Sequence, residues 1–326
     1  MTWQTTLAEG FASSEALLDF LGLPPRLACY ASERQFKTRV PLGFAQRMKP
    51  GDPHDPLLLQ VLASPHELDE RSDFTPDPLK ESIANPLPGL LHKYHGRVLL
   101  TLIGTCAVNC RFCFRRHFPY EDNNPGRSGW QAIFDYIRQD SSIHEVILSG
   151  GDPLLVTDRM LKEFVTGLTT IQHVKTLRFH TRIPIVLPSR IDESFLDFIK
   201  SVSQHVVMVL HCNHSQEINE EVRAACFAMK SAGCVLLNQS VLLRGINDNA
   251  SVLAQLSECL FDCQVLPYYL HVLDKVSGTS HFDVAEVEVQ AIYRALQGVL
   301  PGYLLPRLVR EIAGEASKTL VFSSLK

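Results

Sequence analysis

The chain has 326 residues, of which 45% are hydrophobic and 20% are charged. These proportions are ordinary for a globular protein, and the length suits one large α/β barrel or two domains. The formal net charge of −4 gives no support for nucleic-acid binding, and no apolar run approaches the ~20 residues of a membrane helix. Because residues 1–10 lack the basic start and apolar core of a secretory signal, we expect a cytoplasmic protein whose nine cysteines stay reduced.

Residues 1–92 predict an N-terminal lobe that is mostly helical. The region is rich in proline and charge, and Pro24, Pro50 and Pro86 interrupt short helical stretches such as residues 15–21. We expect no long strand in this lobe.

Residues 93–283 show short apolar runs that alternate with amphipathic stretches. The runs expected to be strands are 98–103, 146–148, 176–180, 206–210, 235–243 and 265–273. The stretches expected to be helices are 129–138, 158–168, 193–200, 219–232, 250–261 and 284–296. Continuous apolar strands are typical of parallel sheets covered by helices, so the pattern predicts an α/β fold with a partial (β/α)6 TIM-like barrel. A third segment, 284–326, adds the last helix and a terminal strand region with a polar loop at 314–318.

Polar residues follow each predicted strand of the barrel. In order along the chain they are a cysteine cluster, Gly150-Gly151-Asp152, His180, His211, Arg244 and Asp274. Barrels of this kind carry their chemistry at the carboxyl ends of the strands. The sequence therefore predicts that one site lies at this end of the barrel.

The cysteine cluster consists of Cys106, Cys110 and Cys113, so three thiols fall within eight residues. Thiolates of this kind hold iron–sulfur clusters, and three of them leave one iron of a [4Fe–4S] cluster open. The alternative is a zinc site completed by His117. We expect the six scattered cysteines to be small buried hydrophobic residues; they are Cys29, Cys212, Cys226, Cys234, Cys259 and Cys263.

The CxxxCxxC spacing, with Phe112 before the last cysteine, resembles the radical S-adenosylmethionine (SAM) superfamily. The stretch 149–153, which contains adjacent glycines after a strand, matches the superfamily's glycine motif. The resemblance implies a [4Fe–4S] cluster on the three cysteines, an external electron donor, and SAM bound at the open iron. It also places Gly150, Gly151 and Asp152 beside SAM.

Five further blocks resemble the lysine 2,3-aminomutases, which are isomerases that add pyridoxal phosphate (PLP) to the radical machinery. The blocks are 92–97, 106–116, 180–184, 238–248 and 267–274, and the likeness extends over roughly residues 40–320. It implies that L-lysine is the substrate and that the C-terminal segment binds PLP.

The aminomutase resemblance also implies individual roles. Lys318 corresponds to the lysine that forms a Schiff base with PLP. Without the resemblance, we would interpret Lys318 as a solvated surface residue. The other correspondences are Lys93 and Arg97 with the PLP phosphate, Arg115 with the substrate α-carboxylate, Asp274 and Glu311 with the distal ammonium, and His211 and Gln239 with SAM. Two acids facing one ammonium favour a basic substrate over glutamate, which is the alternative amino acid.

The chain departs from the longer lysine mutases in three places. Residues 314–317 replace a glycine run before Lys318, and Asn249 stands where those enzymes have a cysteine. The sequence ends at Lys326 without their cysteine-bearing tail, so we expect no intersubunit zinc site. A stretch at 52–57 resembles the EpmB subgroup, which makes (R)-β-lysine that a partner ligase attaches to elongation factor P. A radical SAM enzyme without PLP and a metal-stabilised scaffold are the remaining alternatives.

Overall fold

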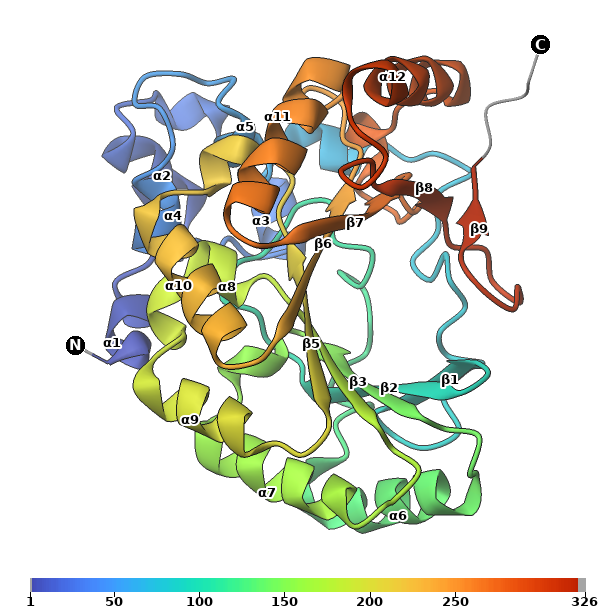
Figure 1. The fold of residues 1–326 in the computed structure, drawn as a ribbon. Helices are drawn as coiled ribbons and strands as arrows, with labels where there is room; N and C mark the ends of the chain where they lie inside the picture. The colour runs from blue at the N-terminus through green and yellow to red at the C-terminus, as the bar shows by residue number, and fades with distance from the viewer. Residues whose placement is uncertain (1, 322–326) are drawn as a thin grey trace.

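The computed structural model describes residues 2–321, which contain one nine-stranded sheet whose strands follow chain order (Figure 1). The strands are β1 (Leu90–Tyr94), β2 (Arg97–Ile103), β3 (Glu145–Gly150), β4 (Thr176–Thr181), β5 (His205–His211), β6 (Val235–Val241), β7 (Leu266–His271), β8 (Arg307–Arg310) and β9 (Thr319–Leu320). Strands β2 to β8 are parallel to one another. The edge strands β1 and β9 are antiparallel to their neighbours and do not pair with each other, so the barrel is open.

Six helices alternate with the parallel strands and cover the outer face of the sheet (Figure 1). They are α6 (Gly126–Gln139), α7 (Asp158–Thr169), α9 (Glu193–Ser201), α10 (Glu220–Ser231), α11 (Ala250–Asp262) and α12 (Glu286–Val299). The predicted partial TIM-like barrel is therefore confirmed. The strands β6 and β7 end two residues before the predicted limits, and β8 adds a seventh parallel strand.

The remaining helices are short. Near the N-terminus they are α1 (Trp3–Ala8), α2 (Ser14–Phe20), α3 (Tyr30–Gln35), α4 (Leu42–Ala45) and α5 (Pro56–Leu59), while α8 (Ile183–Val186) follows β4. Single 3-10 turns span Pro25–Leu27, Pro65–Leu68, Pro153–Leu155, Pro188–Arg190, Ser215–Glu217 and Ser280–Phe282. No helix within residues 2–321 has both the length and the apolar character needed to cross a membrane.

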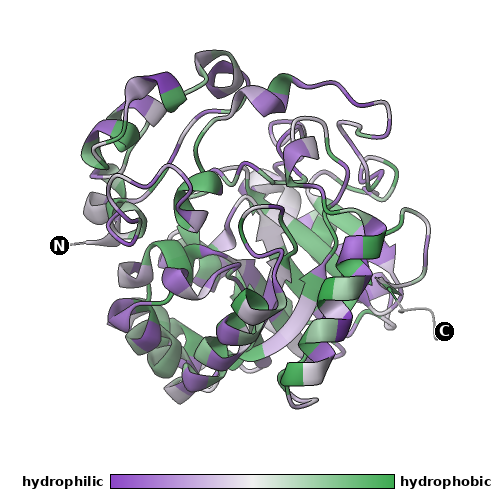
Figure 2. Ribbon diagram, turned by 90° about the horizontal axis from the view of Figure 1, so that it is seen from above, coloured by the Kyte–Doolittle hydropathy of each residue, from purple (hydrophilic) through white to green (hydrophobic). Residues whose placement is uncertain are grey.

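The apolar strand residues and the apolar faces of the helices form the core of the barrel. Several strands in the middle of Figure 2 are green and others are pale, whereas the outer helices carry both colours, as expected when only one face of a helix is buried. The buried face of α6, for example, contains Trp130, Ile133, Phe134 and Ile137. Burying each such side chain contributes about 1.5–3 kcal/mol relative to exposure.

The N-terminal helices share this core with the barrel. Leu17, Phe44 and Leu57 belong to the same continuous cluster of buried side chains as Ile183 and other barrel residues. The chain then crosses the open side of the barrel, where Thr75 donates a backbone hydrogen bond of 3.0 Å to the Lys275 carbonyl, and leads into β1. The first strand thus begins at Leu90, slightly inside the region where no long strand was expected, and it is five residues long.

Candidate active site

A cavity of about 310 Å³ lies inside the curved sheet. All the residues to which the sequence analysis assigned roles line this single cavity: Cys106, Cys110, Cys113, Gly150, Gly151, Asp152, His211, Gln239, Lys93, Arg97, Arg115, Asp274, Glu311 and Lys318. Arg244 is the exception among the residues at the strand ends. It is exposed and donates to Glu288 at 2.6 Å, so the prediction that it joins the site is wrong.

The cysteine loop between β2 and α6 is held from behind by the N-terminal segment. Arg39 donates to the Cys106 carbonyl at 2.9 Å, and the backbone amide of Asn109 donates to the Arg39 carbonyl at 3.0 Å. The amide of Arg111 donates to the Gln60 carbonyl at 2.8 Å. These bonds satisfy the backbone of an irregular loop, so its thiols are presented from a fixed scaffold.

A buried ion pair adds to this support. The fully buried Arg111 donates through Nε to Glu67 at 2.9 Å, and Arg116 donates to the same carboxylate at 2.7 Å. Arg116 also donates to the Gly278 carbonyl at 2.9 Å, which ties the cysteine loop to the loop after β7. One acid therefore joins the arginines that flank Cys113.

The glycine pair after β3 lies directly against the cysteine loop. Gly151 donates to the Ile103 carbonyl at 2.8 Å, and Asp152 donates to the Thr105 carbonyl at 2.9 Å. A Cβ atom added to Gly151 would lie 2.2 Å from the Thr105 carbonyl oxygen. Gly150 has φ +109°, a conformation that side chains rarely adopt. Glycine is required here for a close backbone approach.

The carboxylate of Asp152 is engaged by protein donors. It accepts hydrogen bonds from the Thr181 hydroxyl at 2.7 Å and from the amides of Arg182 and Ile183 at 2.7 and 3.1 Å, and it caps the turn that begins at Pro153. Burial raises its pKa. Asp152 therefore lines the cavity while its carboxylate joins the ends of β3 and β4.

The three cysteines of the cluster are partly buried. Burial, followed by the charge of neighbouring cysteines, raises the pKa of Cys106 well above its usual value and that of Cys113 to about 11. Coordination to a positive inorganic core reverses this effect, because it stabilises thiolates. His117 is exposed and contacts the Ser277 carbonyl at 3.1 Å. It does not line the cavity that contains the three cysteines, so the structure gives no support to a zinc site completed by His117.

Five charged residues of alternating sign form a chain along the cavity. Arg115 donates through two nitrogens to Glu81, both at 2.7 Å, and Lys93 lies 2.8 Å from Glu81. Lys93 also donates to Glu311 at 3.0 Å, and Lys318 donates to Glu311 at 2.6 Å. The side chains expected to bind cofactor and substrate thus pair with one another. Glu81, which lies in an irregular segment, was missed by the sequence analysis.

The charges in this row of residues shift the pKa values of two acids in opposite directions. Although burial acts to raise it, the pKa of Glu311 lies well below its usual range because Lys318 and Lys93 are close. Burial and the charge of Glu311 instead raise the pKa of Asp274 to about 7. A carboxylate held ionised therefore lies near one that gains a proton readily.

Two partly buried histidines, His180 and His211, also line the cavity. Burial lowers the pKa of His211 to about 3 and that of His180 well below its usual value, so both rings are neutral. The Nε2 atoms of both are buried without a hydrogen-bond partner among the described residues. Such atoms are rare in folded proteins, and both of these belong to residues that line the cavity.

The other cysteines and Asn249 have structural surroundings. All six scattered cysteines are unpaired, and Cys212, Cys226, Cys234 and Cys263 are buried as expected, whereas Cys29 and Cys259 are partly exposed. The Asn249 side chain caps α11 by accepting from the Ser251 amide at 2.8 Å.

Comparison with known proteins extends the family resemblance to nearly the whole chain. The chain is 47% identical over 320 residues to L-lysine 2,3-aminomutase of Escherichia coli K12, an alignment that covers 97% of this chain and 93% of that protein. It is 45% identical to the Haemophilus influenzae enzyme of the same name, with coverage of 98% and 95%. The chain belongs to the lysine 2,3-aminomutase family. It is an isomerase, and the predicted family is confirmed.

More distant matches are shorter. The lysine 2,3-aminomutase of Clostridium subterminale is 39% identical over 280 residues, which cover 85% of this chain and 67% of that one. Among solved structures, a radical SAM methyltransferase from Sphaerobacter thermophilus aligns with a TM-score of 0.45 and 15% identity over 68% of each chain. No family model matches the chain.

Proposed function

We propose that this member of the family is a radical SAM, PLP-dependent 2,3-aminomutase that converts L-lysine to β-lysine. The observation that carries the proposal is the shared cavity, because the three thiols of the cysteine loop and the amine of Lys318 line the same space. A thiol cluster that starts a radical reaction and an amine that holds an aldehyde cofactor must face one substrate for both to act on it.

The residues around the cysteine loop fit a [4Fe–4S] cluster and SAM. Three thiols in one short loop would supply the ligands of a cluster with one open iron. The glycine pair allows close backbone approach, and Gln239 and the unpartnered Nε2 of His211 line the same wall. When bound together, the cluster and SAM would supply the radical chemistry that removes hydrogen from the substrate. The protein's part is to exclude water and hold the reactants in contact.

The opposite part of the cavity fits PLP and a basic amino acid. The Lys318 amine would hold the aldehyde, while Lys93 and Arg97 supply cations for a phosphate. PLP supplies an electron sink for the migrating amino group. Glu311 pairs with Lys93 and Lys318. If these two amines were engaged by the cofactor, the carboxylate would be available to an ammonium group of the substrate, with Asp274 in the same cavity.

Arg115 fits recognition of the substrate α-carboxylate. Glu81 occupies the Nε and Nη2 donors, and Ser149 accepts from Nη1 at 3.2 Å. A guanidinium has five N–H donors, so two remain for a carboxylate. Glu81 thus fixes the plane of the guanidinium while leaving an edge available, which favours a planar bidentate contact.

We also propose that the product is (R)-β-lysine and that it serves the modification of elongation factor P through a partner ligase in the cytoplasm. Support comes from the resemblance of the 52–57 stretch to the EpmB subgroup; in the fold, Asp55 of this stretch caps α5 by accepting from the amides of Leu57 and Leu58. The nine unpaired cysteines fit a reducing compartment. Chiral chromatography of the product, followed by transfer to the factor by a ligase, tests this assignment.

Turnover with purified reduced enzyme tests the main proposal. We expect β-lysine from lysine and no β-glutamate from glutamate, because the carboxylates of Asp274 and Glu311 repel a second substrate carboxylate. Lys318→Ala should still form 5′-deoxyadenosine but no β-lysine, while Lys200→Ala on the surface of α9 should behave as wild type. Normal β-lysine formation by Lys318→Ala would contradict the role of PLP.

A further inference from the structure

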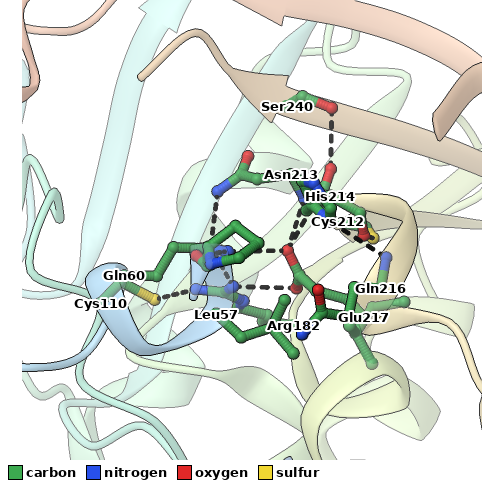
Figure 3. A network of polar contacts seen from close by, with 12 residues as sticks. Leu57, Gln60, Cys110, Arg182, Cys212, Asn213, His214, Gln216, Glu217 and Ser240 are labelled. Atoms are coloured by element: carbon green, nitrogen blue, oxygen red, sulfur yellow. Dashed lines mark hydrogen bonds and ion pairs between the residues drawn. The ribbon is translucent and has the colours of Figure 1, made fainter. Parts of the chain in front are cut away.

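A buried arginine outside the roles considered so far contacts one of the cluster cysteines. Arg182 follows β4, is 5% exposed, and donates through Nη1 to the sulfur of Cys110 at 2.8 Å (Figure 3). Its guanidinium also lies 5.6 Å from the ring centre of Phe112. A full positive charge is thus held against a sulfur that the radical chemistry uses.

The position of this guanidinium is fixed from two sides. Its Nη2 donates to Gln60 at 2.6 Å and to Glu217 at 2.9 Å (Figure 3). Glu217 is itself held by the amides of Asn213 and His214 at 2.9 and 3.1 Å, and by the Gln60 amide at 3.2 Å. Segments before the cysteine loop and after β5 therefore converge on Arg182.

Such a buried network is expensive unless its charges are paired and hydrogen-bonded. Glu217 is fully buried, and although burial acts to raise its pKa, Arg182 holds that pKa below its usual value. The acid is therefore ionised and partly neutralises the guanidinium. The charge that reaches the sulfur depends on both residues.

We propose that Arg182 is a positioning residue for the cluster, which raises the cluster's reduction potential through its contact with Cys110, and that Glu217 moderates this effect. The inference rests on the proposed function, since it requires a [4Fe–4S] cluster on Cys110. Reduction adds one negative charge to the cluster, and hydrogen bonds to sulfur and nearby positive charge stabilise the reduced form. Arg182 thereby makes electron transfer from the donor easier.

Two substitutions with opposite expected signs test the inference. Arg182→Met removes the donor and the charge with little change in volume, and should lower the midpoint potential. Glu217→Gln keeps Arg182 in place but removes the opposing charge, and should raise the potential. We expect about a tenfold change in the ratio of reduced to oxidised cluster at fixed potential in each case, which is about 59 mV for one electron.

The measurement is a redox titration of the reconstituted full chain, followed by electron paramagnetic resonance, with iron and sulfide content determined for every variant. Arg190→Met is the matched control, because Arg190 is also fully buried and paired, with Asp158, but makes its bonds to Leu154, Val156 and Asp158 and none to a cysteine sulfur. Its potential should equal that of wild type. Arg182→Lys, which keeps the charge, should recover part of the shift.

The outcomes separate this inference from the proposed function. Opposite shifts in the two variants, with an unchanged control, support it. Shifts of the same sign, or no shift, overturn it even when the cluster is present. If Arg182→Met does not fold, the sign of the Glu217→Gln shift and the Arg182→Lys value decide. Wild-type protein without iron and sulfide would instead overturn the proposed function itself.

Discussion

Replacing Gly151 by alanine would disturb the contact between β3 and the cysteine loop. The new methyl group would lie 2.2 Å from the Thr105 carbonyl oxygen and 2.6 Å from the Thr105 amide nitrogen. The backbone of Gly151 has no positive φ, so the substitution adds a clash without conformational strain. Backbone atoms on both sides must separate by about 1 Å, and overpacking of this kind costs about 1–3 kcal/mol.

The effect should appear in two assays. For a chain of this length, that destabilisation corresponds to a fall of roughly 1.5–4.5 °C in melting temperature. Displacement of Thr105 also moves Cys106, so iron bound per chain after reconstitution should fall. Gly298→Ala in α12 is the control, because its Cβ atom would meet open space and a helical glycine gains about 0.5–1 kcal/mol on conversion to alanine.

The reasoning would be refuted if Gly151→Ala matched wild type in both melting temperature and iron content. A fall in melting temperature with full iron content would support the predicted clash but contradict the predicted effect on the cluster. Both results are clear because the control is expected to move in the opposite direction.

Three further substitutions probe the network around the site. Asp55→Ala should lower the free energy of unfolding in urea by about 2–4 kcal/mol, since it removes a helix cap and leaves buried donors unpaired, whereas the exposed Asp197→Ala should change it by less than about 0.5 kcal/mol. Glu81→Gln breaks two buried ion pairs and should cost about 3–5 kcal/mol in the same assay. Burial raises the pKa of Asp274 from 3.8 to about 7, so the folded state binds more protons between these values and loses stability as pH rises. The melting temperature of substrate-free Asp274→Asn should therefore rise relative to that of wild type between pH 4 and 7, and the difference should stay constant above pH 7. A difference that does not change between pH 4 and 7 would contradict this.

The barrel could be predicted because most of its parallel strands are rich in apolar residues. Uninterrupted apolar runs such as β5 leave a strong signal, and the six helices between them are amphipathic. The short strands β8 and β9 lack that signal: β8 has arginine at both ends and β9 spans two residues.

The site divides in the same way. The cysteines and the glycine pair have characteristic spacing within short segments, so the sequence predicts them. Glu81 and Glu217 are single acids whose arginine partners lie 34 and 35 residues away, and only the fold brings them together. Asp152 was predicted to contact SAM, yet its carboxylate is engaged by neighbouring protein groups.

The most direct test of the central claim is the iron, sulfide and PLP content of anaerobically purified protein, measured together with its visible spectrum. The proposed aminomutase predicts about four irons, four sulfides and one PLP per chain. A cluster without PLP would keep the radical machinery but remove the role of Lys318. Zinc in place of iron, with neither sulfide nor PLP, would contradict the account.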